Sequence, residues 1–342
     1  MATQSPTQSP QSAFTFLSQG AAIQEFRLDD QNIVLGFPEA KFYRSHNSPY
    51  FGETIGRTTN RVKNARIYDL NGKTYLLYAN DGPNCLHGGK EGWGKKDFEG
   101  PSQVTRNGKE GVQFTYVSRD GDEEFPGTVE CKVWYTANKE DGKTVLDVEY
   151  QVEFVGRECA ETVVGVTNHS YFNLNPGSST IKGTLVNLST DQYLALDSNS
   201  IPTGEIIGHP SAPAPNTTFA LGATSPSFDD CMVINTDSSS IPKDTRTQPL
   251  RRLVTLSHPD TGLNLEVLST EPAFQFYTGE HIDVPALESS TGENIPAKGP
   301  RAGIAVEPSR YVDAQRKEWR GQCLLKQGEV WGARSQYRAW KT

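Results

Sequence analysis

Long apolar runs are missing from this chain of 342 residues, and no segment approaches the ~18 successive apolar residues that predict a membrane-spanning helix. Residues 1–17 have neither a basic start nor an apolar centre, so they lack the features of a secretory signal. Their Ser, Gln, Thr and Pro content predicts a disordered leader over residues 1–12, followed by one domain over residues 13–342. We therefore expect a cytoplasmic protein with no membrane partner.

Cysteine is scarce, and none of its five occurrences belongs to a CxxC pair. An odd number of widely spaced cysteines argues against a disulfide framework and against a zinc site. It favours buried thiols in a reducing compartment. The positions are Cys85, Cys131, Cys159, Cys231 and Cys323.

Several motifs of cofactor chemistry are also absent: the phosphate loop GxxxxGK[ST], the dinucleotide motif GxGxxG, the nucleophile elbow GxSxG and the zinc motif HExxH. The 41 acidic and 33 basic residues give a formal charge of -8, which repels nucleic acid and anionic lipid. We expect no cofactor, neither metal nor nucleotide, and no nucleic-acid partner. Acid–base chemistry on a small molecule needs none of these motifs.

The apolar residues that are present alternate with polar ones, which is typical of half-buried strands. Asn71-Gly72, between residues 65–70 and 73–77, is a strong hairpin signal, and residues 128–136 and 144–154 predict a second hairpin. Further strands are predicted at residues 32–37, 111–118, 161–167, 252–256, 263–269, 273–277 and 303–306. Long loops are predicted at residues 196–227 and 281–301, and strand patterns resume after each, which indicates a single domain. The dominant period of two predicts an all-β fold class with few short helices.

Three residues are candidates for proton transfer. His87 precedes two glycines, which let a backbone approach a ligand closely, although a surface-loop histidine would look the same. His169 follows the strand-like run 161–167, where an imidazole suits proton transfer near neutral pH, and a structural histidine is the alternative. Glu307 follows the apolar run 303–306, where a buried carboxylate is costly unless it is paired. Its alternative is a strand-end residue that turns to solvent.

Other polar residues offer hydrogen bonds to a ligand. Asp229 and Asp230 are either turn residues or acceptors for ligand hydroxyl groups. Arg57 and Arg61 are the first and last residues of the segment RTTNR, and each is either a ligand contact or a solvated charge. None of these signals is specific alone.

Taken together and in chain order, these segments resemble the aldose 1-epimerase (galactose mutarotase) family. The most specific block is TNHSYFNL at residues 167–174. The resemblance also covers residues 20–23, 34–37, 47–52, 56–61, 83–89, 125–127, 201–205, 228–229, 275–279, 307 and 313–314. It therefore spans nearly the whole chain.

The resemblance implies a galactose mutarotase-like β-supersandwich with an open cleft, an isomerase that interconverts the α and β anomers of free aldoses such as D-glucose and D-galactose. The implied partner is one monosaccharide, bound by a monomer or weak homodimer. The family's catalytic base falls on Glu307 and its catalytic acid on His169. Its substrate-binding residues fall on Asn60, Arg61, His87, Asp229 and Gln275.

This assignment carries a geometric expectation. Opening the sugar ring takes a proton from the C1 hydroxyl and delivers one to the ring oxygen, so base and acid must reach two oxygens on one carbon. We expect His87, His169, Asp229 and Glu307 to converge on one cleft. The functional atoms of His169 and Glu307 should lie within about 8–10 Å of each other.

Some positions depart from the family pattern and leave the preferred sugar open. Residues 308–310 read Pro-Ser-Arg where many members have Thr-Gln, Asp230 stands where histidine is frequent, and Trp93 replaces a common phenylalanine. One rival is a hexose-6-phosphate epimerase, which needs a basic cluster, and the only adjacent arginines are Arg251-Arg252. The others are a non-catalytic sugar-binding or regulatory protein and a glycosidase that uses Asp229 and Glu307.

Overall fold

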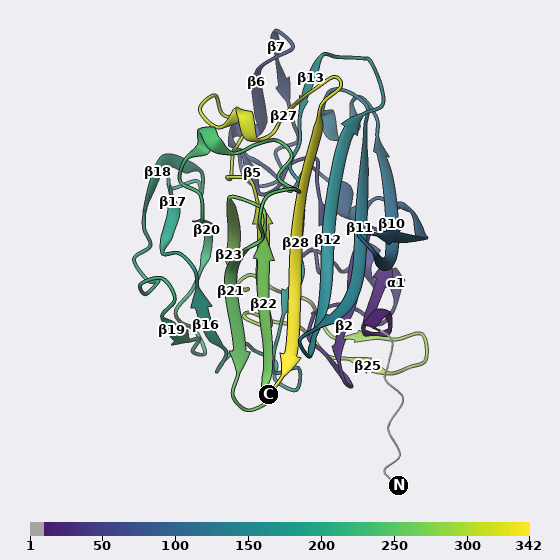
Figure 1. Ribbon diagram of the computed structural model, residues 1–342, viewed down its shortest axis with the longest axis vertical. Helices are drawn as coiled ribbons and strands as arrows, with labels where there is room; N and C mark the ends of the chain where they lie inside the picture. Colours follow the sequence, from purple (N-terminus) through teal and green to yellow (C-terminus); the bar gives the residue numbers. More distant parts are fainter. Residues whose placement is uncertain (1–9) are drawn as a thin grey trace.

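The structure, a computed structural model, describes residues 10–342, so most of the predicted leader over residues 1–12 lies outside the described residues. Two antiparallel sheets form the body of the molecule (Figure 1). The larger sheet has nine strands, in the order β19 (Thr218–Ala220), β16 (Leu185–Leu188), β21 (Arg251–His258), β22 (Leu263–Ser269), β28 (Val330–Lys341), β12 (Lys143–Phe154), β11 (Val129–Glu140), β10 (Lys109–Ser118) and β9 (Glu99–Arg106).

The second sheet has six strands, and it carries part of the site described below. Their order is β15 (Tyr171–Phe172), β26 (Ile304–Ser309), β23 (Ala273–Tyr277), β20 (Asp229–Val233), β17 (Gln192–Leu196) and β18 (Pro202–Gly208). Smaller antiparallel groups are β1 (Phe14–Leu17) with β2 (Ala22–Leu28) and β3 (Gln31–Asn32), β4 (Thr54–Ile55) with β14 (Thr167–Asn168), β5 (Arg61–Val62) with β8 (Cys85–Leu86), β6 (Arg66–Leu70) with β7 (Lys73–Leu76), β13 (Glu161–Val163) with β27 (Leu324–Lys326), and β24 (Leu287–Glu288) with β25 (Asn294–Ile295).

Helices are few and short in the described residues, as predicted. The α-helix is α1 (Ala40–Ser45), and the 3-10 turns are Pro10–Ala13, Lys63–Ala65, Trp93–Lys95, Asp122–Glu124, Ser238–Ser240 and Arg320–Gln322. No helix within residues 10–342 is long and apolar enough to cross a membrane. The expected all-β architecture is confirmed.

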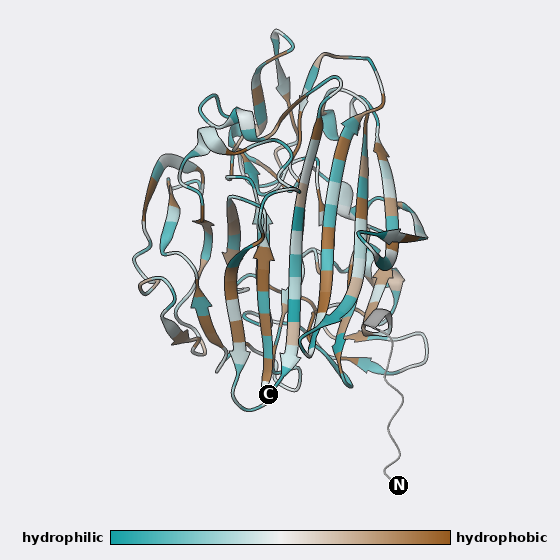
Figure 2. Cartoon of the chain, viewed as in Figure 1, coloured by the Kyte–Doolittle hydropathy of each residue, from teal (hydrophilic) through white to brown (hydrophobic). Residues whose placement is uncertain are grey.

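Alternation along the strands sends neighbouring residues to opposite faces of the six-stranded sheet. Phe274, Phe276 and Val306 are fully buried in the main core, which they share with the inner face of the nine-stranded sheet. Gln275 lies between Phe274 and Phe276, Glu307 follows Val306, and the two polar residues are paired across β23 and β26. They therefore occupy the face turned away from the main core. Figure 2 shows the same alternation as brown and teal bands along the strands.

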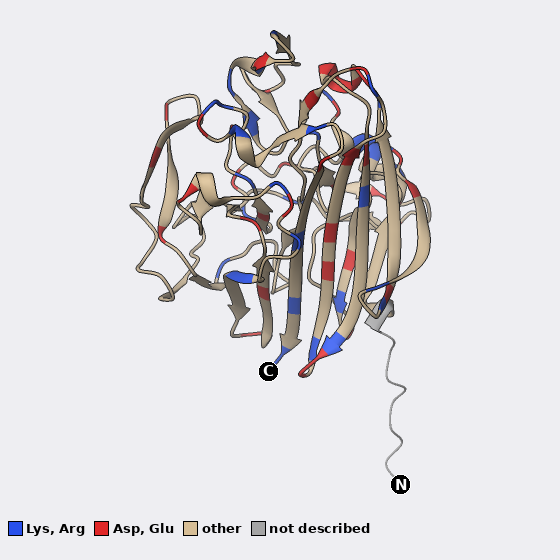
Figure 3. Cartoon of the chain, turned by 45° about the horizontal axis from the view of Figure 1, so that its top comes forward, with Lys and Arg blue, Asp and Glu red and all other residues tan. Residues whose placement is uncertain are grey.

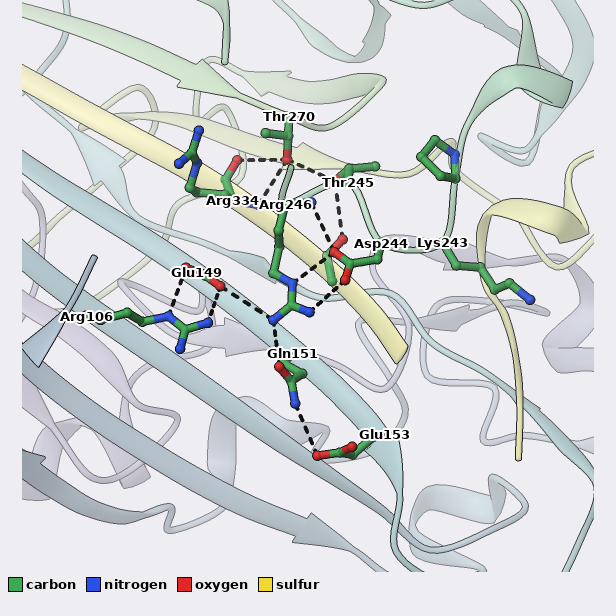
Figure 4. A network of polar contacts seen from close by, with 12 residues as sticks. Arg106, Glu149, Gln151, Glu153, Lys243, Asp244, Thr245, Arg246, Thr270 and Arg334 are labelled. Atoms are coloured by element: carbon green, nitrogen blue, oxygen red, sulfur yellow. Dashed lines mark hydrogen bonds and ion pairs between the residues drawn. The ribbon is translucent and has the colours of Figure 1, made fainter. Parts of the chain in front are cut away.

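The outer face of the nine-stranded sheet is covered by charged side chains of both signs. Arg246 donates to Gln151 over 2.6 Å and pairs with Asp244 over 2.6 Å, and Arg106 donates to Glu149 (Figure 4). Basic residues on β28 and acidic residues on β12 lie on neighbouring strands in Figure 3. Such interspersed charges keep a broad sheet face soluble without one dominant sign.

The structure confirms the strands that had the clearest turn signals and corrects others. The Asn71-Gly72 hairpin forms between β6 and β7, with Gly72 at a φ of 74°. The predicted strand 32–37 is wrong beyond Asn32, apart from one bridge at Val34. The predicted loops 196–227 and 281–301 contain strands β18, β19, β24 and β25. Strand β18 contains a proline and two glycines and is mostly exposed, and strand β19 has only three residues, so neither shows a clear alternation.

Candidate active site

A polar cavity of about 190 Å³ opens on the face of the six-stranded sheet turned away from the main core. All seven residues predicted for the site line it: Asn60, Arg61, His87, His169, Asp229, Gln275 and Glu307. Drug-sized ligands occupy pockets of about 300–1,000 Å³, so a cavity of this size suits one sugar ring. The expectation that the candidate residues converge is met.

Three neighbouring strands supply the carboxylates and the amide. Glu307 on β26 lies directly opposite Gln275 on β23, and Gln275 lies opposite Cys231, two residues beyond Asp229 on β20. The Gln275 amide donates to Asp229 Oδ1 over 2.7 Å. Asp229 is exposed at the mouth of the cavity, whereas Glu307 is only 3 % exposed at its base. Glu307 lies inside its strand, which corrects the prediction that it follows the strand's end.

His169 is held by its backbone immediately after β14. Its N–H donates to the Glu53 carbonyl over 2.8 Å, and its carbonyl accepts from the Gly52 N–H over 3.0 Å. These backbone bonds continue the antiparallel pairing of β4 and β14 beyond its last regular residue pair. The result places His169 Nε2 at 3.4 Å from Glu307 Oε1, well within the predicted limit.

His87 stands beside His169 on the loop that follows β8. Its N–H donates to the Asn60 carbonyl over 3.0 Å, and the two imidazole rings meet edge to face with centroids 5.1 Å apart. Gly88 at φ 82° lies against the Gly56 carbonyl, where a Cβ would come within 2.0 Å. The glycine thus lets two backbone segments approach each other, which corrects the prediction that it makes room for a ligand.

Arg61 belongs to β5, and its guanidinium is fixed from the side. The guanidinium Nε of Arg61 donates to Asp81 Oδ2 over 2.6 Å, and the backbone N–H of Arg61 donates to Asn60 Oδ1 over 2.9 Å. Asp81 was not predicted from the sequence. No local pattern links it to Arg61, since the contact is created by the β5–β8 pairing and the loop between these strands.

Burial governs the protonation of His169 and Glu307. It lowers the pKa of the His169 imidazole to about 3 and raises the pKa of the Glu307 carboxyl well above its ordinary value, with the neighbouring Asp229 charge adding to the second effect. Both effects favour the neutral forms of the two side chains. The pair therefore has one proton that can pass between carboxyl and imidazole, and this proton rests on Glu307. Moving that proton to His169 leaves the net charge of the pair unchanged. Burial likewise lowers the pKa of His87 well below its usual value.

Several cavity residues were missed from the sequence. Tyr50, Tyr171, Tyr277 and His281 line the cavity, and the Tyr171 ring centroid lies 5.1 Å from that of His169. Tyr50 and Tyr171 lie within segments already quoted for the family resemblance, which was the available signal. Tyr277 lies two residues after Gln275 on β23, so strand alternation places it on the same face.

The positions that depart from the family pattern have structural partners. Arg310 is 2 % exposed, pairs with Glu271 and donates to the Lys243 carbonyl over 2.7 Å, so it anchors the chain just after β26. Asp230 accepts from His209 Nε2 at 3.0 Å, because His209 Nδ1 already accepts two backbone N–H groups. Neither residue lines the cavity.

A second, larger cavity of about 300 Å³ lies near Lys63, Asp313 and Arg316. It contains charged residues of both signs but no histidine. In the first cavity, one possible ligand atom each from His87, His169 and Glu307 lie within 4.8 Å of one another, a separation that could hold a metal ion.

Comparison with known proteins agrees with this geometry. The profile of the family described as aldose 1-epimerase matches residues 7–338. The chain belongs to the aldose 1-epimerase family. Galactose mutarotase of Sus scrofa is 34% identical over 331 residues, which cover 94% of this chain and 89% of that protein.

Other similar proteins differ from this chain in length or in sequence. The bifunctional protein gal10 of Schizosaccharomyces pombe is 34% identical over 328 residues, 93% of this chain, but the chain spans only 42% of that protein. Among solved structures, an aldose epimerase homologue from C. elegans shares the fold with a TM-score of 0.78 at 22% identity, covering 96% of this chain and 95% of that chain. The galactose 1-epimerase of Lactobacillus acidophilus has a TM-score of 0.75 at 20% identity, and the match covers 96% of this chain and 91% of that chain.

Proposed function

We propose that this chain is an aldose 1-epimerase that interconverts the α and β anomers of free aldoses, D-galactose and D-glucose among them. The observation that carries the proposal is the His169–Glu307 pair, with its functional atoms 3.4 Å apart at the base of a sugar-sized cavity. An acid and a base at this separation both reach the two oxygens of one anomeric carbon. The family membership supports the same reaction.

The roles of the two residues follow from their shared proton. When a sugar binds, its hydroxyl groups donate hydrogen bonds to Glu307 and favour the carboxylate, so the proton moves to His169. Glu307 then removes the proton of the C1 hydroxyl while His169 protonates the ring oxygen, and the hemiacetal C1–O bond breaks. Rotation about C1–C2 and the reverse transfers close the ring as the other anomer. The pair regains its starting charge at the end of the cycle.

The remaining cavity residues hold the sugar. Arg61, fixed by Asp81, and His87 present nitrogen atoms to the ring oxygen and nearby hydroxyls. Asp229 and Gln275, joined by their own hydrogen bond, accept from and donate to hydroxyls further around the ring. These contacts orient the anomeric carbon between base and acid, and orientation supplies a large share of the rate enhancement.

The rival functions fit the cavity less well. A hexose-6-phosphate epimerase needs a basic cluster, and Arg61 is the one Arg or Lys among the described residues that line the cavity, already bound to Asp81. A glycosidase needs two carboxyl groups as its reacting pair, whereas Glu307 is paired with a histidine. Retention of both members of the proton pair argues against a non-catalytic sugar-binding protein.

We further propose that the enzyme acts in the cytoplasm, as a monomer or weak homodimer, and as one domain over residues 13–342. The five cysteines are free thiols, four of them buried, which suits a reducing compartment.

Polarimetry tests the proposed reaction and its sugar range. Freshly dissolved α-D-galactose, α-D-glucose and L-arabinose should reach their equilibrium rotation faster in the presence of the purified protein. The order of kcat/KM across the three sugars gives the preference. Rates equal to the spontaneous ones for all three sugars would refute the proposal.

Chelation tests whether the proton pair works without a metal. The mechanism uses only side chains, so exhaustive dialysis against EDTA should leave the mutarotation rate unchanged. His87, His169 and Glu307 are close enough to hold a metal ion, which makes this a discriminating test. A preparation that EDTA inactivates and that zinc or magnesium restores would assign these residues to a metal centre instead.

A further inference from the structure

Glu53 is a buried carboxylate that the mechanism above does not use. Its side chain is fully buried and does not line the sugar cavity. Glu53 Oε1 accepts from Lys95 Nζ over 2.6 Å and from Asn47 Nδ2 over 2.7 Å. Glu53 Oε2 has no hydrogen-bond partner among the described residues and lies against Gly94, where a Cβ would come within 2.2 Å. A buried charge of this kind is costly, so its retention calls for an explanation.

The three side chains close a loop that forms one wall of the cavity. Besides its bond to Glu53, Lys95 Nζ donates to the Asn47 carbonyl over 2.7 Å, and the Asn47 side chain bonds both the N–H and the carbonyl of Phe51. Residues 47–53 are thereby tied at both ends. Between the ties lie the cavity residues Ser48, Pro49 and Tyr50, with Tyr50 at a φ of 65°.

The same loop reaches both histidines of the site. The Glu53 carbonyl and the Gly52 N–H hold the His169 backbone. The Tyr50 ring centroid lies 4.9 Å from that of His87 and 5.7 Å from that of His169. Lys95 Nζ lies 4.9 Å from the same Tyr50 centroid. The ammonium group and the two imidazoles thus all lie close to one aromatic ring.

We propose that Glu53 and Lys95 are a positioning ion pair for the epimerase reaction, which holds residues 47–53 so that Tyr50 and His169 keep their places against the sugar. The pair acts through His169 and touches no substrate atom. This inference rests on the proposed function. The pair also sets the local charge, because an uncompensated Lys95 would raise the cost of protonating either histidine.

The pair is sensitive to pH near neutrality. Burial raises the pKa of Glu53 to about 7, against the opposing effects of Lys95 and Asn47. The other titratable groups that interact with the pair are Tyr43 from α1, Tyr50, His87 and His169. Burial raises the pKa of both tyrosines, so they stay neutral in this range. Above pH 7 the Glu53 carboxylate completes the ion pair, and below pH 7 Glu53 takes up a proton.

Glu53→Gln tests the pair, because glutamine keeps the shape and one acceptor but has no charge. At pH 8 we expect kcat for D-galactose to fall about tenfold and KM to change less. A displacement of a catalytic group by about 1 Å lowers the rate about 10²-fold, and a smaller displacement lowers it less. Wild-type kcat should decline between pH 8 and pH 6 toward the variant's value, and the variant should lack this step. Glu149→Gln removes another largely buried carboxylate from ion pairs on the outer sheet face, and it should leave kcat and its pH profile unchanged.

A second pair of variants covers the case in which Glu53→Gln does not fold. Lys95→Met should reproduce the loss of kcat, and Lys95→Arg should restore most of it. The proposal would be overturned if whichever of Glu53→Gln and Lys95→Met folds kept the wild-type kcat and pH profile. Equal losses of kcat in Lys95→Met and Lys95→Arg would also overturn it.

A readout independent of turnover separates this proposal from the proposed function. The ring carbon–proton NMR signals of His87 and His169, assigned through single histidine replacements, should shift in Glu53→Gln and stay in place in Glu149→Gln. A wild-type protein without mutarotase activity would refute the function, yet the ring signals would still decide whether the ion pair positions the histidines. Unshifted signals would refute the ion pair alone.

Discussion

Glu307→Gln should lower kcat for galactose mutarotation by at least ~10²-fold, the lower end of the contribution of a positioned acid–base group. Glutamine keeps the size of the side chain and one hydrogen-bond acceptor, but it cannot take the proton of the C1 hydroxyl. Sugar affinity should change far less, because Arg61, His87 and Asp229 still line the cavity. Steady-state kinetics by polarimetry gives both parameters. A loss confined to kcat marks an interaction made mainly in the transition state.

Asp229→Asn is the matched control for this experiment. It also replaces a cavity carboxylate by its amide, but Asp229 lies at the exposed mouth and bonds Gln275 rather than the proton pair. We expect it mainly to raise KM. Near-normal kcat in Glu307→Gln would mean that another group takes the C1 proton, and Asp229 or Asp230 would then be the next residue to replace.

His169→Gln should give the second large effect, a fall in kcat of about 10²-fold or more, because glutamine cannot carry the proton to the ring oxygen. His169 and Glu307 share one proton across 3.4 Å, so they act as a unit. The double variant should therefore be little slower than either single variant, since the effects of residues that act together are far from additive. Rate losses that multiply in the double variant would show that the two residues act independently and would contradict the shared-proton mechanism.

Sequence could predict those site residues that lie on strands with clear alternation or within contiguous motif segments. Residues 273–277 were predicted as a strand with the observed bounds, and Gln275 lies on its polar face. Glu307 was expected just beyond a strand and lies within one, because Pro308 and Ser309 continue the pairing with β23. The proline does not end this strand, since Pro308 lies opposite Phe274 within the sheet.

The part that sequence could not predict depends on contacts between distant segments. Asp81 fixes Arg61 from twenty positions away, and Glu53 reaches Lys95 across forty-two. The central strand β28 was missed because its polar outer residues, Arg334 among them, interrupt the apolar ones, although Trp331 and Tyr337 are buried in the core. Burial also reverses the simple assignment of protonation states: the resting proton lies on the carboxyl, which the order of residues along the chain does not reveal.

The central claim is that the His169–Glu307 pair exchanges the anomers of an intact free sugar. Magnetisation transfer between the α and β anomeric protons of D-galactose at equilibrium measures this exchange directly by NMR. We predict exchange well above the spontaneous rate with the wild-type protein, exchange near that rate with Glu307→Gln, and no signals from any other sugar. Wild-type exchange equal to the spontaneous rate, or the appearance of a sugar altered at another carbon, would contradict the claim.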